Sequence, residues 1–337
     1  MVITDYSRRY ILKAAMSNCT SQNTTQGQVD VVFVSVYALV FVAGLALNLT
    51  ALIIFLLNSK LRLHTTVYMI HLAFADLLLV CTLPVRIYYH GGFRELPLKI
   101  CEFTGLILLA NMYGSIFLLT CISFDRCIAV CFPLSSRVRE GRKKAWCVCL
   151  GIWLLTLGTS LPIYFKDQPI AHINSSSNTE HCFERFPKYA TQPAALISTL
   201  IVGFGIPLTV MILSSWGLLQ ALSKSTAAQN SELVDSGRIK RMITTNLAIF
   251  LFCFLPYHFM LLLLYVYTDS SLQCSLVPVY HYSLMIACLN AMLDPLAYYF
   301  TTETFRRKID VEAVRKIWQM NSHCSEGNNC PPAPLTT

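Results

Sequence analysis

The sequence is short of charge. Its 337 residues include 26 Lys or Arg and 18 Asp or Glu, so charged residues make up only 13% of the chain. An ordinary soluble domain carries about 25%. Hydrophobic residues make up 55%. This composition argues against an ordinary soluble domain and indicates a protein that crosses a membrane several times.

Strand-like alternation is also missing, whereas long apolar runs are frequent. A helix needs about 20 apolar residues to span a bilayer, and seven runs reach this length. A segment in the bilayer must satisfy its own backbone hydrogen bonds, so each run is predicted to be a helix. The predicted helices cover residues 31–57, 65–89, 103–125, 145–165, 194–222, 242–267 and 276–300.

Lysine and arginine gather in the connections on one side of these helices, which is therefore predicted to be cytoplasmic. The N-terminus then lies outside. No cleavable signal is visible in residues 1–30, so the first helix is expected to act as its own anchor. Glycosylation sequons on the predicted outer side agree with this orientation, and they begin at Asn18, Asn23 and Asn174.

Most of the 14 cysteines lie inside predicted helices. Four lie at predicted outer positions, and an even number in an oxidising compartment suggests two disulfides. Pairing Cys101 with Cys182 would hold the longest outer loop over the bundle. Cys19 and Cys274 would then tie the outer tail to the last outer loop.

Each predicted helix also carries one polar, aromatic or proline feature. The third ends in CISFDRCIAVCFPL (121–134), where an acid and an arginine are adjacent. This pair is either a juxtamembrane salt bridge or a latch, in which Asp125 holds Arg126 until it is released towards a cytosolic partner. The other features are Asn48, Asp76, Trp153, Pro207, FLFCFLPYH (250–258) and LNAMLDPLAYYF (289–300).

As an ordered set, these features resemble the motifs of rhodopsin-like (class A) G-protein-coupled receptors, over roughly residues 30–318. The resemblance implies an all-α membrane protein with an extracellular tail (1–30), a seven-transmembrane-helix receptor domain (31–302), a short amphipathic membrane-surface helix (303–318) and a cytoplasmic tail (319–337). It implies a plasma-membrane location and coupling to heterotrimeric G proteins and arrestin. Neither catalytic residues nor a nucleic-acid partner are expected.

The resemblance also assigns roles to matching residues. A polar network at mid-membrane would hold either a sodium ion or hydrogen bonds without an ion, because two carboxylates there need a cation, a shared proton or water. No other metal and no cofactor is expected. The network would comprise Asn48, Asp76, Ser115, Asn290 and Asp294, and the activation and G-protein-coupling residues would be Asp125, Arg126, Leu134, Phe250, Phe254, Pro256, Pro295 and Tyr298.

The chain departs from the family pattern at Ser215. Most receptors have a Tyr at this position, eight residues after the helix-five proline, and it helps Arg126 and Tyr298 to hold the active state. That part of the mechanism is therefore not carried over.

Two ligand classes are excluded by residues that the chain lacks. Amine receptors carry an Asp in the upper third helix, where this chain has Leu108. Retinal pigments need a Lys in the seventh helix, where this chain has Cys288.

An arginine lies instead near the outer end of the second helix, in LPVRIYYH (83–90). Charge in a membrane is costly, so Arg86 snorkels to water, pairs with an acid or receives an anion. It follows the kinking residue Pro84, has basic neighbours, and lacks acids in the outer halves of helices two, six and seven. Arginine suits bidentate binding of carboxylate or phosphate, which favours an anionic ligand.

Within the family, LPVRIYY, NMYGSIFLLTCISFDR and LDPLAYYF resemble the branch of nucleotide and lysophospholipid receptors. Nucleotide receptors usually carry a cation three residues after the position of His258, but here Phe-Met-Leu follows, and HFMLLLLYVY (258–267) suits an acyl chain. We therefore expect an anionic lysophospholipid such as lysophosphatidic acid. Its binding residues would be Arg86, His90, Tyr113, Arg185, His258 and His281.

The alternatives are a nucleotide or other small-anion receptor of this branch, a constitutively active receptor, and a transporter. A transporter would show internal repeats and broken helices, and the sequence has no visible repeat. An enzyme is disfavoured, because the His-x4-Asp spacing of HLAFAD (71–76) would place its acid in mid-membrane, and no other catalytic block follows.

Overall fold

Every regular element in the described part of the chain is helical. The computed structural model describes residues 29–57, 64–93, 95–132, 135, 140, 143–166, 182–183, 193–226, 233–267 and 270–301. The helices are α2 (Val31–Leu57), α3 (His64–His90), α4 (Leu98–Cys131), α6 (Ala145–Lys166), α7 (Pro193–Ser198), the π-helix η2 (Thr199–Gly205), α8 (Ile206–Thr226), α9 (Leu233–Val266), α10 (Ser270–Cys288) and α11 (Asn290–Thr301).

These segments form seven membrane-length units, because α7, η2 and α8 follow one another directly and α10 and α11 are separated only by Leu289. Six units of the described chain are long and apolar enough to span a bilayer, and Ala145–Ser160 of α6 is a shorter apolar stretch. The α6 backbone continues to Lys166, for 22 residues in all. The predicted seven-helix bundle is thus confirmed.

Two helices extend well past their apolar runs. The third was expected over 103–125 but spans Leu98–Cys131, and the sixth was expected from 242 but begins at Leu233. Charge ends an apolar run, but it does not end a helix that satisfies its own backbone in water. The predicted surface helix (303–318) and cytoplasmic tail (319–337) lie outside the described residues.

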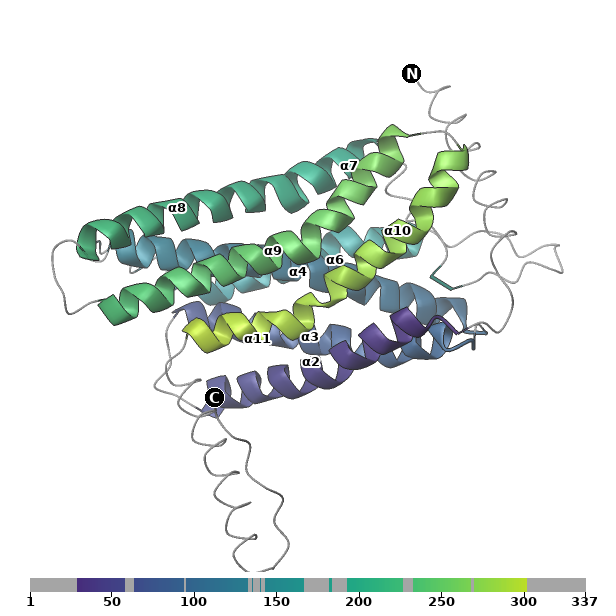
Figure 1. The fold of residues 1–337 in the computed structure, drawn as a ribbon, viewed down its shortest axis with the longest axis horizontal. Helices are drawn as coiled ribbons and strands as arrows, with labels where there is room; N and C mark the ends of the chain where they lie inside the picture. The colour runs from purple at the N-terminus through teal and green to yellow at the C-terminus, as the bar shows by residue number, and fades with distance from the viewer. Residues whose placement is uncertain are drawn as a thin grey trace, which may run out of the picture.

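Helix α4 lies at the centre of the bundle and contacts α3, α6, α8 and α9. In Figure 1, α2 and α3 run along one side and α8 runs along the opposite side. Leu119 and Ile122 of α4 are buried in the main apolar core together with Phe250 of α9. Large apolar side chains such as Leu154 and Leu213 are exposed on the outside, as expected for a surface that faces lipid.

The fifth unit contains a π-helix that the sequence analysis did not predict. The backbone N–H of Ile206 bonds the carbonyl of Ile201, five residues back, and Pro207 follows at once. Such bulges are frequent at functional sites. Here the bulge places Gly203 against α4, where a Cβ at residue 203 would lie 2.9 Å from Cε1 of Tyr113.

We expect Gly203→Ala to destabilise the receptor by about 1–3 kcal/mol, because the added methyl group overpacks against the partly buried ring of Tyr113. Thermal unfolding of the purified protein measures this loss. The matched control is Gly158→Ala in α6, where a Cβ meets nothing within 4 Å. The control should unfold at the same temperature as the wild type or higher. Equal effects of the two substitutions would contradict the close contact.

Candidate functional site

A network of buried polar side chains lies among α2, α3, α4 and α11. The amide of Asn111 donates to Oδ1 of Asp76 at 3.1 Å, and the amide of Asn290 donates to Oδ2 of Asp294 at 2.9 Å. Both aspartates are fully buried. The sequence analysis missed Asn111, although it lies one helical turn before Ser115, on the same face of α4.

The network offers several oxygen atoms that make no hydrogen bond within the described residues. They are Oδ2 of Asp76, Oγ of Ser115, Oδ1 of Asn290 and Oδ1 of Asp294. Hard cations prefer oxygen ligands, and two buried carboxylates require a compensating charge. The donor set therefore fits a sodium ion, which would supply that charge. The described residues contain no group of three or more His, Cys, Asp or Glu side chains that could hold a metal ion. The network has only two such residues, Asp76 and Asp294, and its other oxygens come from Ser115 and Asn290.

Asn48 supplies a hydrogen bond that the backbone of α11 cannot make for itself. Pro295 has no N–H to bond the carbonyl of Ala291, four residues earlier. The Asn48 amide donates to that carbonyl at 2.6 Å, and also to the carbonyl of Gly44 at 3.0 Å. The side chain of α2 thus replaces the hydrogen bond that Pro295 removes from α11.

The predicted latch lies near the inner end of α4. Asp125 is buried and accepts a hydrogen bond from the hydroxyl of Thr65, which links α4 to α3. The sequence analysis did not identify Thr65. Arg126 follows Asp125 directly, as the motif requires. Leu134 lies outside the described residues, as does the side chain of Tyr298.

The other switch residues lie on α9. Phe250 and Phe254 are fully buried, six and two residues before Pro256, and their rings meet edge to face at 5.7 Å. Ser215, which stands in place of the usual Tyr, donates to the carbonyl of Met211 in its own helix at 2.6 Å. Its hydroxyl therefore bonds α8 and does not supply the cross-helix contact expected of a Tyr.

The outer site is centred on Arg86, which is 4% exposed. Its guanidinium lies over the ring of Phe183, 4.5 Å from the centroid, and donates to the hydroxyl of Tyr37. Nε makes no hydrogen bond, and no carboxylate pairs with Arg86 among the residues that the structure describes. Arg86 points into the bundle, so it does not snorkel to water.

Two predicted ligand-binding histidines are engaged in other contacts. The ring of His90 pairs with Asp30 at 3.3 Å and stacks on Phe33 at 4.5 Å, which ties the outer ends of α2 and α3 together. The sequence analysis did not count Asp30 among the nearby acids. His281 donates to the backbone carbonyl of Phe183.

Tyr113 and His258 meet deeper in the bundle. Their rings are 5.9 Å apart, and His258 also stacks on Phe204 at 4.3 Å. Nδ1 of His258 lies 2.8 Å from the carbonyl of Phe254, so Nδ1 carries the hydrogen. In the neutral ring, the buried Nε2 is then an acceptor. Arg185 lies outside the described residues.

A disulfide joins Cys101 to Cys182, with 5.6 Å between their Cα atoms. This bond holds the Cys182–Phe183 turn against the outer end of α4. Several predicted outer features lie outside the described residues, namely Cys19, the side chain of Cys274, and the sequons at Asn18, Asn23 and Asn174.

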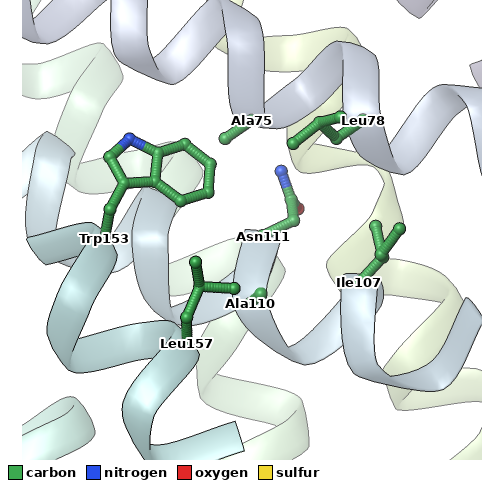
Figure 2. A pocket seen from close by; sticks show the side chains of 7 residues that line it. All are labelled: Ala75, Leu78, Ile107, Ala110, Asn111, Trp153 and Leu157. Carbon is green, nitrogen blue, oxygen red and sulfur yellow. The ribbon is translucent and has the colours of Figure 1, made fainter. Parts of the chain in front are cut away.

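A small cavity of about 50 Å³ lies between α3, α4 and α6. Figure 2 shows Trp153 and Leu157 of α6 facing Ala75 and Leu78 of α3, with Asn111 between them. Its lining is apolar apart from Asn111 and the indole N–H of Trp153, which donates to Nδ1 of His71 at 3.1 Å. None of the predicted ligand-binding residues lines it, so it is not the anion site.

This arrangement agrees with the known proteins that the chain resembles. The family model described as "7 transmembrane receptor (rhodopsin family)" matches residues 47–298. The chain therefore belongs to the rhodopsin family of seven-transmembrane receptors, as predicted, and it is a receptor rather than an enzyme.

Its relatives include lysophosphatidic acid receptors, which belong to the predicted branch. Human lysophosphatidic acid receptor 6 is 37% identical over 286 residues, which cover 82% of this chain and 82% of that receptor. Human lysophosphatidic acid receptor 4 is 34% identical over 90% of this chain and 84% of its own length. Human G-protein coupled receptor 68 is 33% identical over 81% of this chain and 74% of its own length.

We expect Asn48→Ala to lower the free energy of unfolding by about 1–3 kcal/mol, because the carbonyl of Ala291 is left buried without a donor. Thermal unfolding measures this loss. In a Pro295→Ala background the loss should shrink, since the new N–H can bond that carbonyl within the helix. An undiminished loss in that background would show that Asn48 acts through some other contact.

Proposed function

We propose that this receptor lies in the plasma membrane, with its N-terminus outside and its C-terminus in the cytoplasm, and binds an anionic lysophospholipid such as lysophosphatidic acid. Binding activates heterotrimeric G proteins. The observation that carries the proposal is Arg86, a cation enclosed by the bundle that pairs with no carboxylate among the described residues.

The headgroup phosphate would bind at Arg86. Guanidinium groups hold phosphate through paired N–H donors, and Nε of Arg86 is one donor that no described residue uses. Tyr37 and His281 lie near this charge, and neither side chain is a carboxylate that could compensate it. The outer-loop cation Arg185 would assist at the entrance.

The acyl chain would lie against the outer half of α9. Met260, Leu261 and Leu264 are buried on its inner face, within two turns after His258. An apolar wall favours an acyl chain over a polyphosphate, which would need further cations. The names of the relatives support the same class, because two of the receptors described above, human receptors 6 and 4, are named for lysophosphatidic acid.

Activation would open the inner face of the bundle. Leu218 and Leu222 of α8 pack there against Met242 and Ile243 of α9, and all four side chains are buried. A ligand shifts a two-state balance only by its differential affinity for the two states. Lysophospholipid binding would favour the state in which these inner ends move outward and admit a G protein, which contacts Leu134. Arrestin would bind the same face.

A panel of ligands tests this function directly. Cells that express the receptor are exposed to lysophosphatidic acid, other lysolipids and nucleotides, with G-protein dissociation as the readout. We expect a response to an anionic lysolipid. A response to nucleotides alone would overturn the lipid assignment.

In the same assay, Arg86→Ala should lower the potency of the lysolipid about 10- to 100-fold, the equivalent of one charged hydrogen-bonded contact. Lys99→Ala removes the same charge from an exposed position on the same outer side and should change potency little. Surface expression is measured for both variants. Normal potency of a well-expressed Arg86→Ala receptor would disprove the headgroup site.

We also propose that Asp76 and Asp294 hold sodium. Sodium chloride should then raise the unfolding temperature of the purified receptor more than choline chloride does, because a bound ion stabilises the folded state by mass action. The substitution Asp76→Asn should abolish the difference. If the two salts act equally on the wild type, the network holds no sodium.

A further inference from the structure

Phe183 lies at the centre of the outer site, although nothing in the amino-acid sequence indicates a role for it there. It is in the outer connection between α6 and α7, far from Arg86 in the chain. Its ring covers the Arg86 guanidinium with 4.5 Å from Cζ to the ring centroid. Cation–π pairs of this kind are strongest where water is excluded, and Arg86 is 4% exposed.

Several contacts hold Phe183 in this position. The preceding residue, Cys182, is bonded to Cys101, and the Phe183 ring meets Tyr89 edge to face at 5.2 Å. The ring of His281 donates to the Phe183 carbonyl. The backbone of Phe183 has φ 61°, a left-handed conformation that is rare for a bulky side chain and persists where surrounding contacts impose it.

An aromatic partner differs from a carboxylate in what it leaves to a ligand. A carboxylate would take up the N–H donors of Arg86 and neutralise its charge. A ring over the guanidinium face stabilises the charge without neutralising it and leaves the in-plane N–H groups for an anion. One N–H group bonds the Tyr37 hydroxyl, but Nε of Arg86 makes no hydrogen bond to any described residue and is available to an anion.

We propose that Phe183 is a positioning residue of the anion site. Its ring fixes the guanidinium plane of Arg86 through the cation–π contact, while the Cys101–Cys182 bond and His281 fix the ring. The ligand then binds a side chain that is already ordered, which raises affinity by lowering the cost of binding. This inference rests on the proposed function, because it takes the anion at Arg86 to be a lysophospholipid headgroup.

Fluorinated phenylalanines at position 183 test the contact, since each added fluorine weakens the negative ring face with little change in shape. We expect the lysophosphatidic acid concentration for half-maximal binding to rise stepwise from Phe to trifluoro-Phe, by roughly 2- to 30-fold in total. The matched control is the same series at Phe93, an exposed ring that stacks on Tyr88 at 4.7 Å, where affinity should not change.

The series is repeated in an Arg86→Met background, where the expected result is no dependence on fluorine. If affinity does not change with fluorination in the wild type, Phe183 only packs against its neighbours. If affinity rises, the Phe183 ring competes with the ligand for Arg86. Either result overturns the proposal.

A ligand-free measurement separates this inference from the proposed function. Without any lipid, fluorination at 183 should lower the unfolding temperature of the Arg86 receptor and leave that of the Arg86→Met receptor unchanged. If fluorination lowers the unfolding temperature only when Arg86 is present, but lysophosphatidic acid does not bind the wild type, the proposed function fails while the contact stands. If fluorination has the same effect with and without Arg86, and lysophosphatidic acid binds, only the inference about Phe183 fails.

Discussion

The outer half of this receptor is organised around a buried positive charge. Enclosing a guanidinium in a membrane bundle costs several kcal/mol on most scales, even near the outer end of a helix. Within the described residues, Arg86 is met by the Tyr37 hydroxyl and the Phe183 ring, and by no carboxylate. Its partners thus hold the side chain in place without neutralising its charge. The anionic ligand that we propose would supply the opposite charge.

The polar network of α2, α3, α4 and α11 is only partly satisfied by its own side chains. Asp76 takes a hydrogen bond from Asn111, and Asn48 supplies the donor that Pro295 denies to its own helix. Arg86 and Asp76 lie on the same helix, α3, on either side of Pro84. The proposed ligand-binding charge and the network that links α2, α4 and α11 are therefore joined by one helix, which contains Pro84.

Much of this could be predicted from sequence, because a bilayer imposes strict rules on composition. Apolar length fixed the seven helices, and their ordered motifs indicated the family. Contacts between distant segments were harder to predict. No periodicity pairs Asp30 with His90, connects Thr65 to Asp125, or brings Phe183 onto Arg86. The π-helix η2 was missed since its residues are as apolar as those of an α-helix.

The most direct test of the account is an experimental structure of the receptor bound to lysophosphatidic acid. The account predicts the phosphate within hydrogen-bonding distance of the Arg86 guanidinium, the Phe183 ring still against its face, and the acyl chain along α9. A headgroup bound elsewhere, with Arg86 paired to an acid of the receptor, would contradict it.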